Sequence, residues 1–184
     1  MSEEMLVRFC APTLAGLKTG NLISCRITTR EEIICEVQKL NREVVPKGVC
    51  IIPLSFTSTR ALIYVFRPKK LKQDLSEKEI VELLKEAGYQ NVRAEECLLE
   101  LMHRLKIQQD FPHEIGLFLS YPIEDVRGFI QNHAGNFKCV GCWKVYGDEY
   151  LARKRFAMYE KCTEVYYRQW KHGKTINQLT VSAK

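Results

Sequence analysis

Residues 22–66 of this 184-residue chain have the sequence LISCRITTREEIICEVQKLNREVVPKGVCIIPLSFTSTRALIYVF. Thr29-Arg-Glu-Glu32 is a capping box, and apolar residues then recur at helical spacing to about Glu43, which predicts a helix. The β-branched apolar runs on either side of it predict three strands, at 22–27, 49–54 and 60–66, the last two joined as a hairpin. A strand, a helix and a hairpin in this order favour a sheet covered by helices.

Two more helices are predicted directly downstream. Ser76-Glu-Lys-Glu79 is a second capping box, and the apolar stripe that follows it ends at Gly88, a helix stop. Another helix is expected from Ala94 to about Gln108. The basic connection from Arg67 to Asp74 precedes both, and we interpret it as a mobile loop.

The remaining segments also alternate between helix and strand. Pro12 divides the N-terminal helical pattern into two expected pieces, 3–10 and 13–18. A short helix should follow Tyr121-Pro122, and a long amphipathic helix should begin at Asp148 and end near His172. Further strands are expected at Glu114–Ser120, Phe137–Tyr146 and Ile176–Val181. The fold class that follows is α/β, a single domain over residues 1–184 with a mixed β-sheet covered by helices and a long C-terminal helix.

Composition and charge narrow the class of protein. The chain is 46% hydrophobic and 27% charged, which is typical of a globular domain. It lacks the ~20-residue apolar run of a membrane span and the basic and apolar regions of a signal peptide, so we expect a cytoplasmic protein without a membrane partner and with reduced cysteines. The net charge of +6 lies entirely in residues 138–184, because residues 1–137 carry 18 basic and 18 acidic side chains.

The basic C-terminal region raises the question of nucleic-acid binding. On the long helix, the residues of one stripe are apolar or aromatic, whereas most charged residues lie on the far side; the stripe contains Ala152, Phe156, Tyr159, Thr163, Tyr166 and Trp170. Stacking on bases needs aromatic rings and positive charge on the same face. We therefore expect no specific nucleic-acid binding, and a basic face that meets an acidic protein partner.

The junction near Tyr121 is the candidate ligand site. Ligands of α/β proteins bind at the carboxyl ends of strands, where Tyr121, Glu124 and Asp125 would lie, with His113 at the start of the same strand. The competing interpretation is that Glu124 and Asp125 only complement the dipole of the helix that begins there. Cys10 is a candidate nucleophile, against the simpler interpretation of a buried thiol.

Cys139-Val-Gly-Cys142 resembles half of a metal site. The flanking residues alternate with period two, which predicts one uninterrupted strand in which the two thiols point to opposite faces. We therefore predict no metal site at this pair.

Three segments resemble a known family: CAPTLAGLKTGNL (10–22), FPHEIGLFLSYPIEDVRGFI (111–130) and CWKVYGDE (142–149). They are similar to the bacterial, largely clostridial, domain-of-unknown-function family numbered 3793, and the resemblance covers essentially the whole chain. It implies no activity, cofactor or catalytic residue, so these stay unknown. The prediction for function is a non-enzymatic binding or regulatory module with a basic C-terminal face. The alternative is a small enzyme with its ligand site at the strand-to-helix junction near Tyr121.

Overall fold

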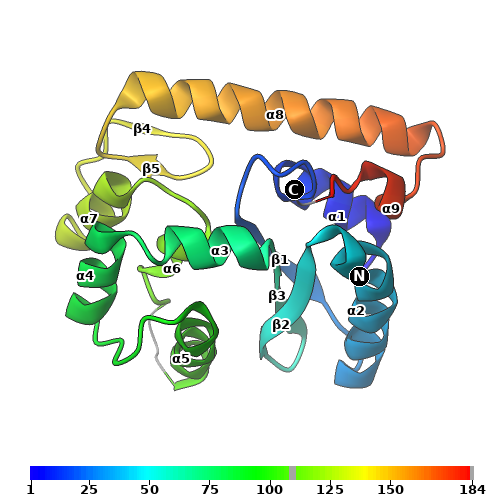
Figure 1. Ribbon diagram of the computed structural model, residues 1–184, viewed down its shortest axis with the longest axis horizontal. Helices are drawn as coiled ribbons and strands as arrows, with labels where there is room; N and C mark the ends of the chain where they lie inside the picture. Colours follow the sequence, from blue (N-terminus) through cyan, green and yellow to red (C-terminus); the bar gives the residue numbers. More distant parts are fainter. Residues whose placement is uncertain (108–110, 183–184) are drawn as a thin grey trace. The chain divides into compact units, whose positions relative to one another are not determined.

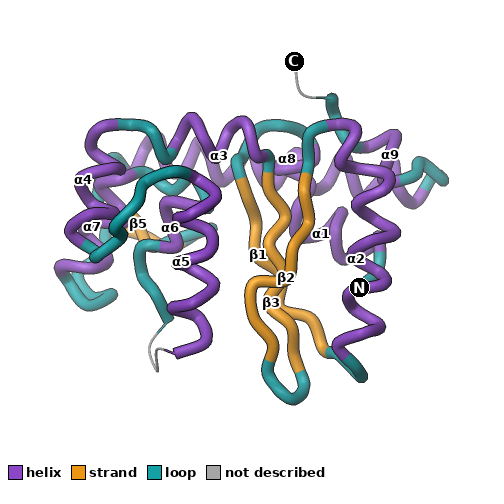
Figure 2. Tube along the Cα trace, turned by 60° about the horizontal axis from the view of Figure 1, so that its bottom comes forward, coloured by secondary structure: helices purple, strands orange, loops and turns teal. Residues whose placement is uncertain are grey.

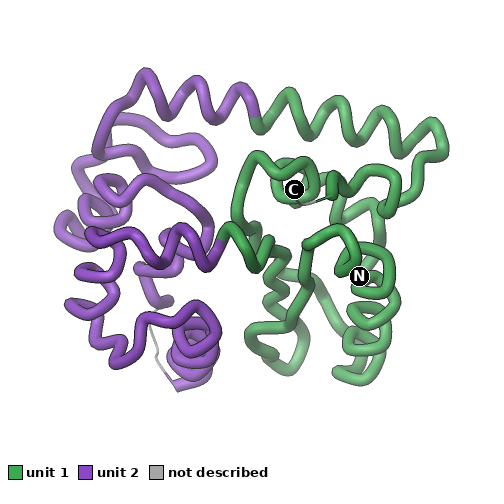
Figure 3. The backbone as a smooth tube through the Cα atoms, in the orientation of Figure 1, with its two compact units in different colours: residues 1–70, 159–184 green, residues 71–158 purple. Residues whose placement is uncertain are grey.

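The structure is a computed structural model that describes residues 1–107 and 111–182. The chain divides into two compact units, shown in Figure 3. Unit 1 contains Met1–Lys70 and Tyr159–Lys184, and unit 2 contains Leu71–Met158. Because compact units can belong to one domain, the single domain expected over residues 1–184 stays a prediction.

Unit 1 is built on a three-stranded sheet of β1 (Gly20–Arg26), β3 (Arg60–Phe66) and β2 (Cys50–Phe56), in that order (Figures 1 and 2). Helix α2 (Arg30–Val44) begins at Thr29, whose hydroxyl accepts from the Glu32 amide, and a 3-10 turn, Val45–Lys47, follows it. Helix α1 (Glu3–Leu14) and α2 contact β1 and β2 respectively, so the α/β class with helices covering a sheet is confirmed.

The mixed strand pairing expected in this sheet is wrong, because β3 pairs antiparallel with both of its neighbours. A strand–helix–strand unit such as β1–α2–β2 makes a sheet mixed only where its two parallel strands are neighbours. The tight β2–β3 hairpin instead inserts β3 between them. The two parallel strands are thereby separated, and each pairs with β3 alone.

Both ends of unit 1 differ from their sequence predictions. Residues 3–14 form one helix, α1, rather than two pieces: Pro12 lies in its last turn, where it removes one intrahelical N–H donor without dividing the helix. Residues 176–179 form helix α9 (Ile176–Leu179) rather than a strand. Thr175 and Gln178 make a complete capping box, a helix signal that outweighs the short apolar alternation.

The connection after β3 is ordered around a buried arginine. Arg67 is 4% exposed, and its guanidinium donates from Nε to the Thr13 carbonyl at 2.7 Å and from Nη2 to the carbonyls of Leu14 (2.6 Å) and Val181 (2.8 Å). The bonds to Thr13 and Leu14 give the last carbonyls of α1 a second donor besides the backbone N–H groups of Gly16 and Val181, and the third bond ties Val181 to the same helix end. The mobile loop expected at 67–74 is wrong, because helix α3 (Pro68–Asp74) begins with a proline suited to a first turn.

Unit 2 contains α4 (Lys78–Glu86), α5 (Ala94–Ile107), α6 (Ile115–Phe118), α7 (Ile123–Gln131) and a short hairpin of β4 (Cys139–Val140) and β5 (Lys144–Val145). Helices α4, α5 and α7 are confirmed, and the expected last residue of α5, Gln108, lies outside the described residues. The capping box at Ser76 is not formed: Glu77 is the N-cap, and the Ser76 hydroxyl donates to the Gln73 carbonyl.

Two predicted strands of unit 2 are wrong. Residues 115–118 form α6, whose four residues are all buried, and an apolar run buried on every side has the same pattern in a helix as in a strand. Residues 137–146 are broken into β4 and β5 by a turn at 141–143. Gly141 permits this turn, because a Cβ at that position would collide with the ring of Phe156.

Helix α8 (Glu149–Lys171) is the long C-terminal helix, and Asp148 Oδ1 caps it by accepting from the Leu151 amide at 3.0 Å. Its residues up to Met158 belong to unit 2 and those from Tyr159 to unit 1. The predicted facing is confirmed: Ala152 and Tyr159 are buried, and the rest of the aromatic stripe is half-buried. Among the helices of residues 1–107 and 111–182, none has both the length and the apolar character needed to span a bilayer.

Candidate functional site

Unit 2 contains a cavity of about 290 Å³ between α6, α7 and the β4–β5 hairpin. Its walls are largely aromatic, with rings from Phe111, His113, Tyr121, Phe129 and Trp143, and the aliphatic part comes from Ile115, Val126 and Val140. Helices α6 and α7 approach closely because Gly116 has no side chain: a Cβ there would lie 2.8 Å from Val126 Cγ2. We call this cavity the aromatic pocket.

The aromatic rings of one wall are stacked in a fixed order. The centroids of Tyr121 and Trp143 are 4.8 Å apart with their planes inclined by 29°, and Phe156 meets Trp143 edge-on at 4.5 Å. The Tyr121 hydroxyl donates to the Cys142 carbonyl at 3.2 Å, which ties the turn after α6 to the hairpin turn. On another wall the ring of His113 packs edge-on against Phe129 at 5.0 Å. Such pairs hold the walls of the pocket in place.

Asp125, in the first turn of α7, is 3% exposed and holds the hairpin against that helix. Its Oδ2 accepts from Trp143 Nε1 at 2.6 Å, and its Oδ1 accepts from the backbone amides of Tyr146 and Gly147, each at 2.7 Å. The carboxylate therefore does more than complement the helix dipole. Three donors converge on it, so the hairpin uses three of the about four acceptor positions of the carboxylate.

Lys144 on β5 supplies the positive charge of the pocket lining. Its Nζ donates to the Ala134 carbonyl at 2.8 Å and lies 4.8 Å from the ring centroid of Phe137 and 5.8 Å from that of Phe129. Lys138 lies on the same hairpin but outside the pocket, where its Nζ donates to the Gly147 carbonyl at 2.6 Å. The two lysines thus have similar bonds and different surroundings.

Three of the four candidates from the sequence, His113, Tyr121 and Asp125, line the aromatic pocket. Glu124 does not: it is exposed, on the solvent side of α7. The expected geometry is wrong, because the segment before Tyr121 is helix α6 and the site lies at a helix–turn–helix junction. Sequence reasoning missed Trp143 and Lys144, although the motif CWKVYGDE contains both, because a continuous strand would have placed them on opposite faces.

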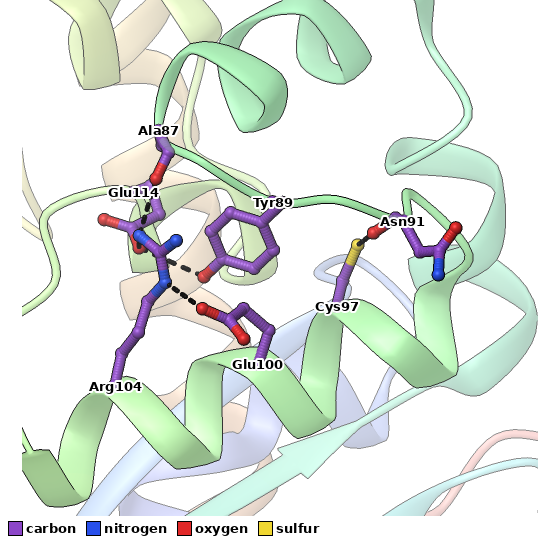
Figure 4. Close-up of polar contacts among 7 residues, drawn as sticks. All are labelled: Ala87, Tyr89, Asn91, Cys97, Glu100, Arg104 and Glu114. Atoms are coloured by element: carbon purple, nitrogen blue, oxygen red, sulfur yellow. Dashed lines mark hydrogen bonds and ion pairs between the residues drawn. The ribbon is translucent and has the colours of Figure 1, made fainter.

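A second polar cluster in unit 2 is structural (Figure 4). Glu114 is 6% exposed, and its Oε1 accepts from the Tyr89 hydroxyl at 3.0 Å and from Arg104 Nη1 at 3.2 Å. Arg104 also donates to the Ala87 carbonyl and to Glu100. Burial, followed by the charge of Glu114, raises the pKa of Tyr89 far above its usual range, so the phenol stays a donor. This cluster joins the end of α4 to α5 and α6, and its partly exposed member Glu100 also lines a shallow cavity of about 270 Å³.

The two cysteines of Cys139-Val-Gly-Cys142 lie on a hairpin, not on one strand. Cys139 is half-buried on β4, and Cys142 is exposed in the turn. Across the described part of the chain, no group of three or more histidine, cysteine or acidic side chains is arranged to hold a metal ion. Cys10 is buried, and desolvation raises the pKa of its thiol far above the ordinary value, the opposite of what a nucleophile requires.

Thiol reactivity tests this distribution of cysteines. Burial raises the pKa of Cys97 and of Cys162 to about 11, so at pH 8 each should react with iodoacetamide roughly 100-fold more slowly than an ordinary exposed thiol. The exposed Cys142 should be modified first, together with Cys35 and ahead of Cys139. Peptide mass spectrometry over a time course measures the order. Equal rates at Cys142 and Cys162 would contradict the burial described here.

Comparison with known proteins gives a family but no close relative of known activity. No curated protein and no solved structure matches the chain significantly. A family model described as "Protein of unknown function (DUF3793)" matches residues 6–180, nearly the whole chain, in agreement with the resemblance of the three sequence segments. The chain therefore belongs to the DUF3793 family.

Proposed function

We propose that this protein is a non-enzymatic binding module that takes a compact, mainly apolar aromatic ligand in the aromatic pocket of unit 2. The observation that carries the proposal is the pocket lining, in which five rings surround a cavity of about 290 Å³. Ligand sites are concave, largely apolar and equipped with few polar groups, and typical volumes begin near 300 Å³. A ligand of one or two fused rings suits this size.

The polar groups of the lining favour binding over catalysis. Asp125 accepts three hydrogen bonds from the hairpin, and the Tyr121 hydroxyl donates to a backbone carbonyl. A general base needs a free acceptor within reach of the substrate proton. His113, exposed at the mouth of the pocket, is the side chain on which the alternative, a small enzyme near Tyr121, would depend.

Titration with 2-naphthamide, a neutral two-ring probe, tests the binding proposal. The indole N–H resonance of Trp143 should shift, because that group lines the pocket and donates to Asp125. The indole of Trp170, in unit 1, is an internal control and should not shift. Phe129→Ala removes one wall and should weaken binding about 5- to 20-fold.

The matched control for that variant is Tyr150→Ala. Tyr150 is an exposed aromatic of the same unit that does not line the pocket, so this variant should keep the wild-type affinity. Binding that leaves the Trp143 resonance unchanged, or that survives Phe129→Ala at full strength, would contradict the proposal.

The basic face of α8 supports a second proposal, contact with an acidic protein partner in the cytoplasm. Several of its charges are neutralised within the helix, by Glu149–Arg153 and by Lys161–Glu164–Arg168. Within the described residues, the exposed Lys154 and Arg155 form no ion pair and are available to an acidic surface.

The exposed thiols of Cys35 and Cys142 suit a reducing compartment. Binding to polyanions should be weak, lost with salt and indifferent to base sequence.

A further inference from the structure

We infer that the ligand of the aromatic pocket is an aromatic carboxylate and that Lys144 binds its anionic group. The inference rests on the proposed function and adds the charge of the ligand to it. It follows from the bonds of Lys144, from those of Asp125, and from the rings that surround the ammonium group.

Lys144 has unused capacity to bind an anion. An ammonium group has three N–H donors, and the contact with the Ala134 carbonyl uses one of them. The side chain is half-buried, and in the part of the chain that the structure describes no carboxylate forms an ion pair with it. Rings of Phe129 and Phe137 within 6 Å of Nζ stabilise the cation only in part. A ligand carboxylate would supply the missing counter-charge through charge-assisted hydrogen bonds.

Asp125, the other charged group of the lining, does not favour a cationic ligand. Aromatic pockets that recognise ammonium groups present negative charge or ring faces to them. Here both oxygens of Asp125 already accept hydrogen bonds, three in all, and the side chain is 3% exposed. The lining therefore presents two unused donors from Lys144 and at most one unused acceptor position from the buried Asp125, on Oδ2. This combination selects an anion next to an apolar ring system.

Three probes of the same shape separate charge from shape: 2-naphthoate, 2-naphthamide and 2-naphthylmethylammonium. Calorimetric titration of the wild-type chain should give an affinity for 2-naphthoate about tenfold above that for 2-naphthamide, and the ammonium probe should bind weakest. In the Lys144→Met variant, 2-naphthoate and 2-naphthamide should bind with about equal affinity. The affinity for 2-naphthamide should stay within about twofold of wild type. Retained binding of the neutral probe also shows that this variant is folded.

Lys138→Met is the matched control, because it removes an equal charge from the same hairpin outside the pocket. It should keep the wild-type preference, and Lys144→Arg should restore most of it. If both methionine variants lost the preference for the carboxylate, the preference would come from the net charge of the hairpin and not from Lys144, and the inference would be overturned. Tightest binding of the ammonium probe would also overturn it. Failure of all three probes would overturn the proposed function itself, whereas equal binding of the neutral and anionic probes would overturn the assignment of Lys144 alone.

Discussion

Replacing Asp125 by alanine should lower the free energy of unfolding of unit 2 by about 3–5 kcal/mol. The substitution leaves three donors without an acceptor: the indole N–H of Trp143 and the backbone amides of Tyr146 and Gly147. Each is a group for which an unmade hydrogen bond is costly. Urea denaturation followed through the indole resonance of Trp143 measures the loss where it should occur.

Glu124→Ala provides the control, because Glu124 is the neighbouring acid in the same first turn of α7 but is exposed. It should change stability by less than about 0.5 kcal/mol, the scale of a surface substitution. The free energy of unfolding of Asp125→Asn should lie between those of Asp125→Ala and Glu124→Ala. An amide keeps one acceptor oxygen but turns its NH₂ group toward one of the donors. If the Asp125 and Glu124 variants were equally stable, the acid would be a dipole partner only, as the simpler interpretation of the sequence held.

The second large effect is expected in unit 1, where Arg67→Met should lower the free energy of unfolding by about 2–3 kcal/mol. Methionine fills a similar volume but removes the donor of the Val181 carbonyl and one of the two donors of the Thr13 and Leu14 carbonyls, which keep the backbone N–H groups of Gly16 and Val181. Burial lowers the pKa of Arg67, but a guanidinium stays charged throughout the ordinary pH range. The loss of unfolding free energy should therefore be the same at every pH between about 5 and 9. The indole resonance of Trp170 reports on this unit during urea denaturation.

Arg60→Met is the comparison variant on the same strand. Arg60 also donates to a hydroxyl and a carbonyl, those of Ser24, but it is exposed, so water can replace those bonds. Its substitution should cost less than about 1 kcal/mol. Arg67→Lys should recover less than half of the loss, since a single ammonium cannot reproduce the guanidinium fork. A wild-type midpoint in Arg67→Met would show that the three carbonyls are satisfied in another way.

The sequence predicted best those elements whose start, period and end agree. Helices α2 and α8 have a capping residue, a 3.6-residue apolar period and a following glycine or polar stop, and both are confirmed. The β2–β3 hairpin has two β-branched runs and a polar turn of the right length. Where one of these signals was missing, tertiary burial determined the outcome. Residues 115–118 are buried on all sides as α6, so their apolar run carries no period.

The candidate site was predictable in part. Tyr121 and Asp125 were chosen because they follow an expected strand, at whose carboxyl end ligands of α/β proteins bind, and both line the pocket although the expected strand is a helix. Trp143 and Lys144 could not be placed, since their positions depend on a break at Gly141. That break depends in turn on contact with Phe156, 15 residues further along the chain. Information of this kind is absent from any local window of sequence.

The discontinuity of unit 1 has a consequence for the order in which the protein is made. Its sheet and α1 are synthesised first, but Ile176 and Leu179 of its core and the Val181 carbonyl bound by Arg67 are synthesised last. At ordinary elongation rates, residues 71–184 take roughly 5–25 s to appear. Unit 2 is a continuous segment, whereas unit 1 waits with the apolar residues of α1 and α2 that α9 contacts uncovered. Nascent chains stalled near residue 160 should therefore bind chaperones through the N-terminal third of the protein.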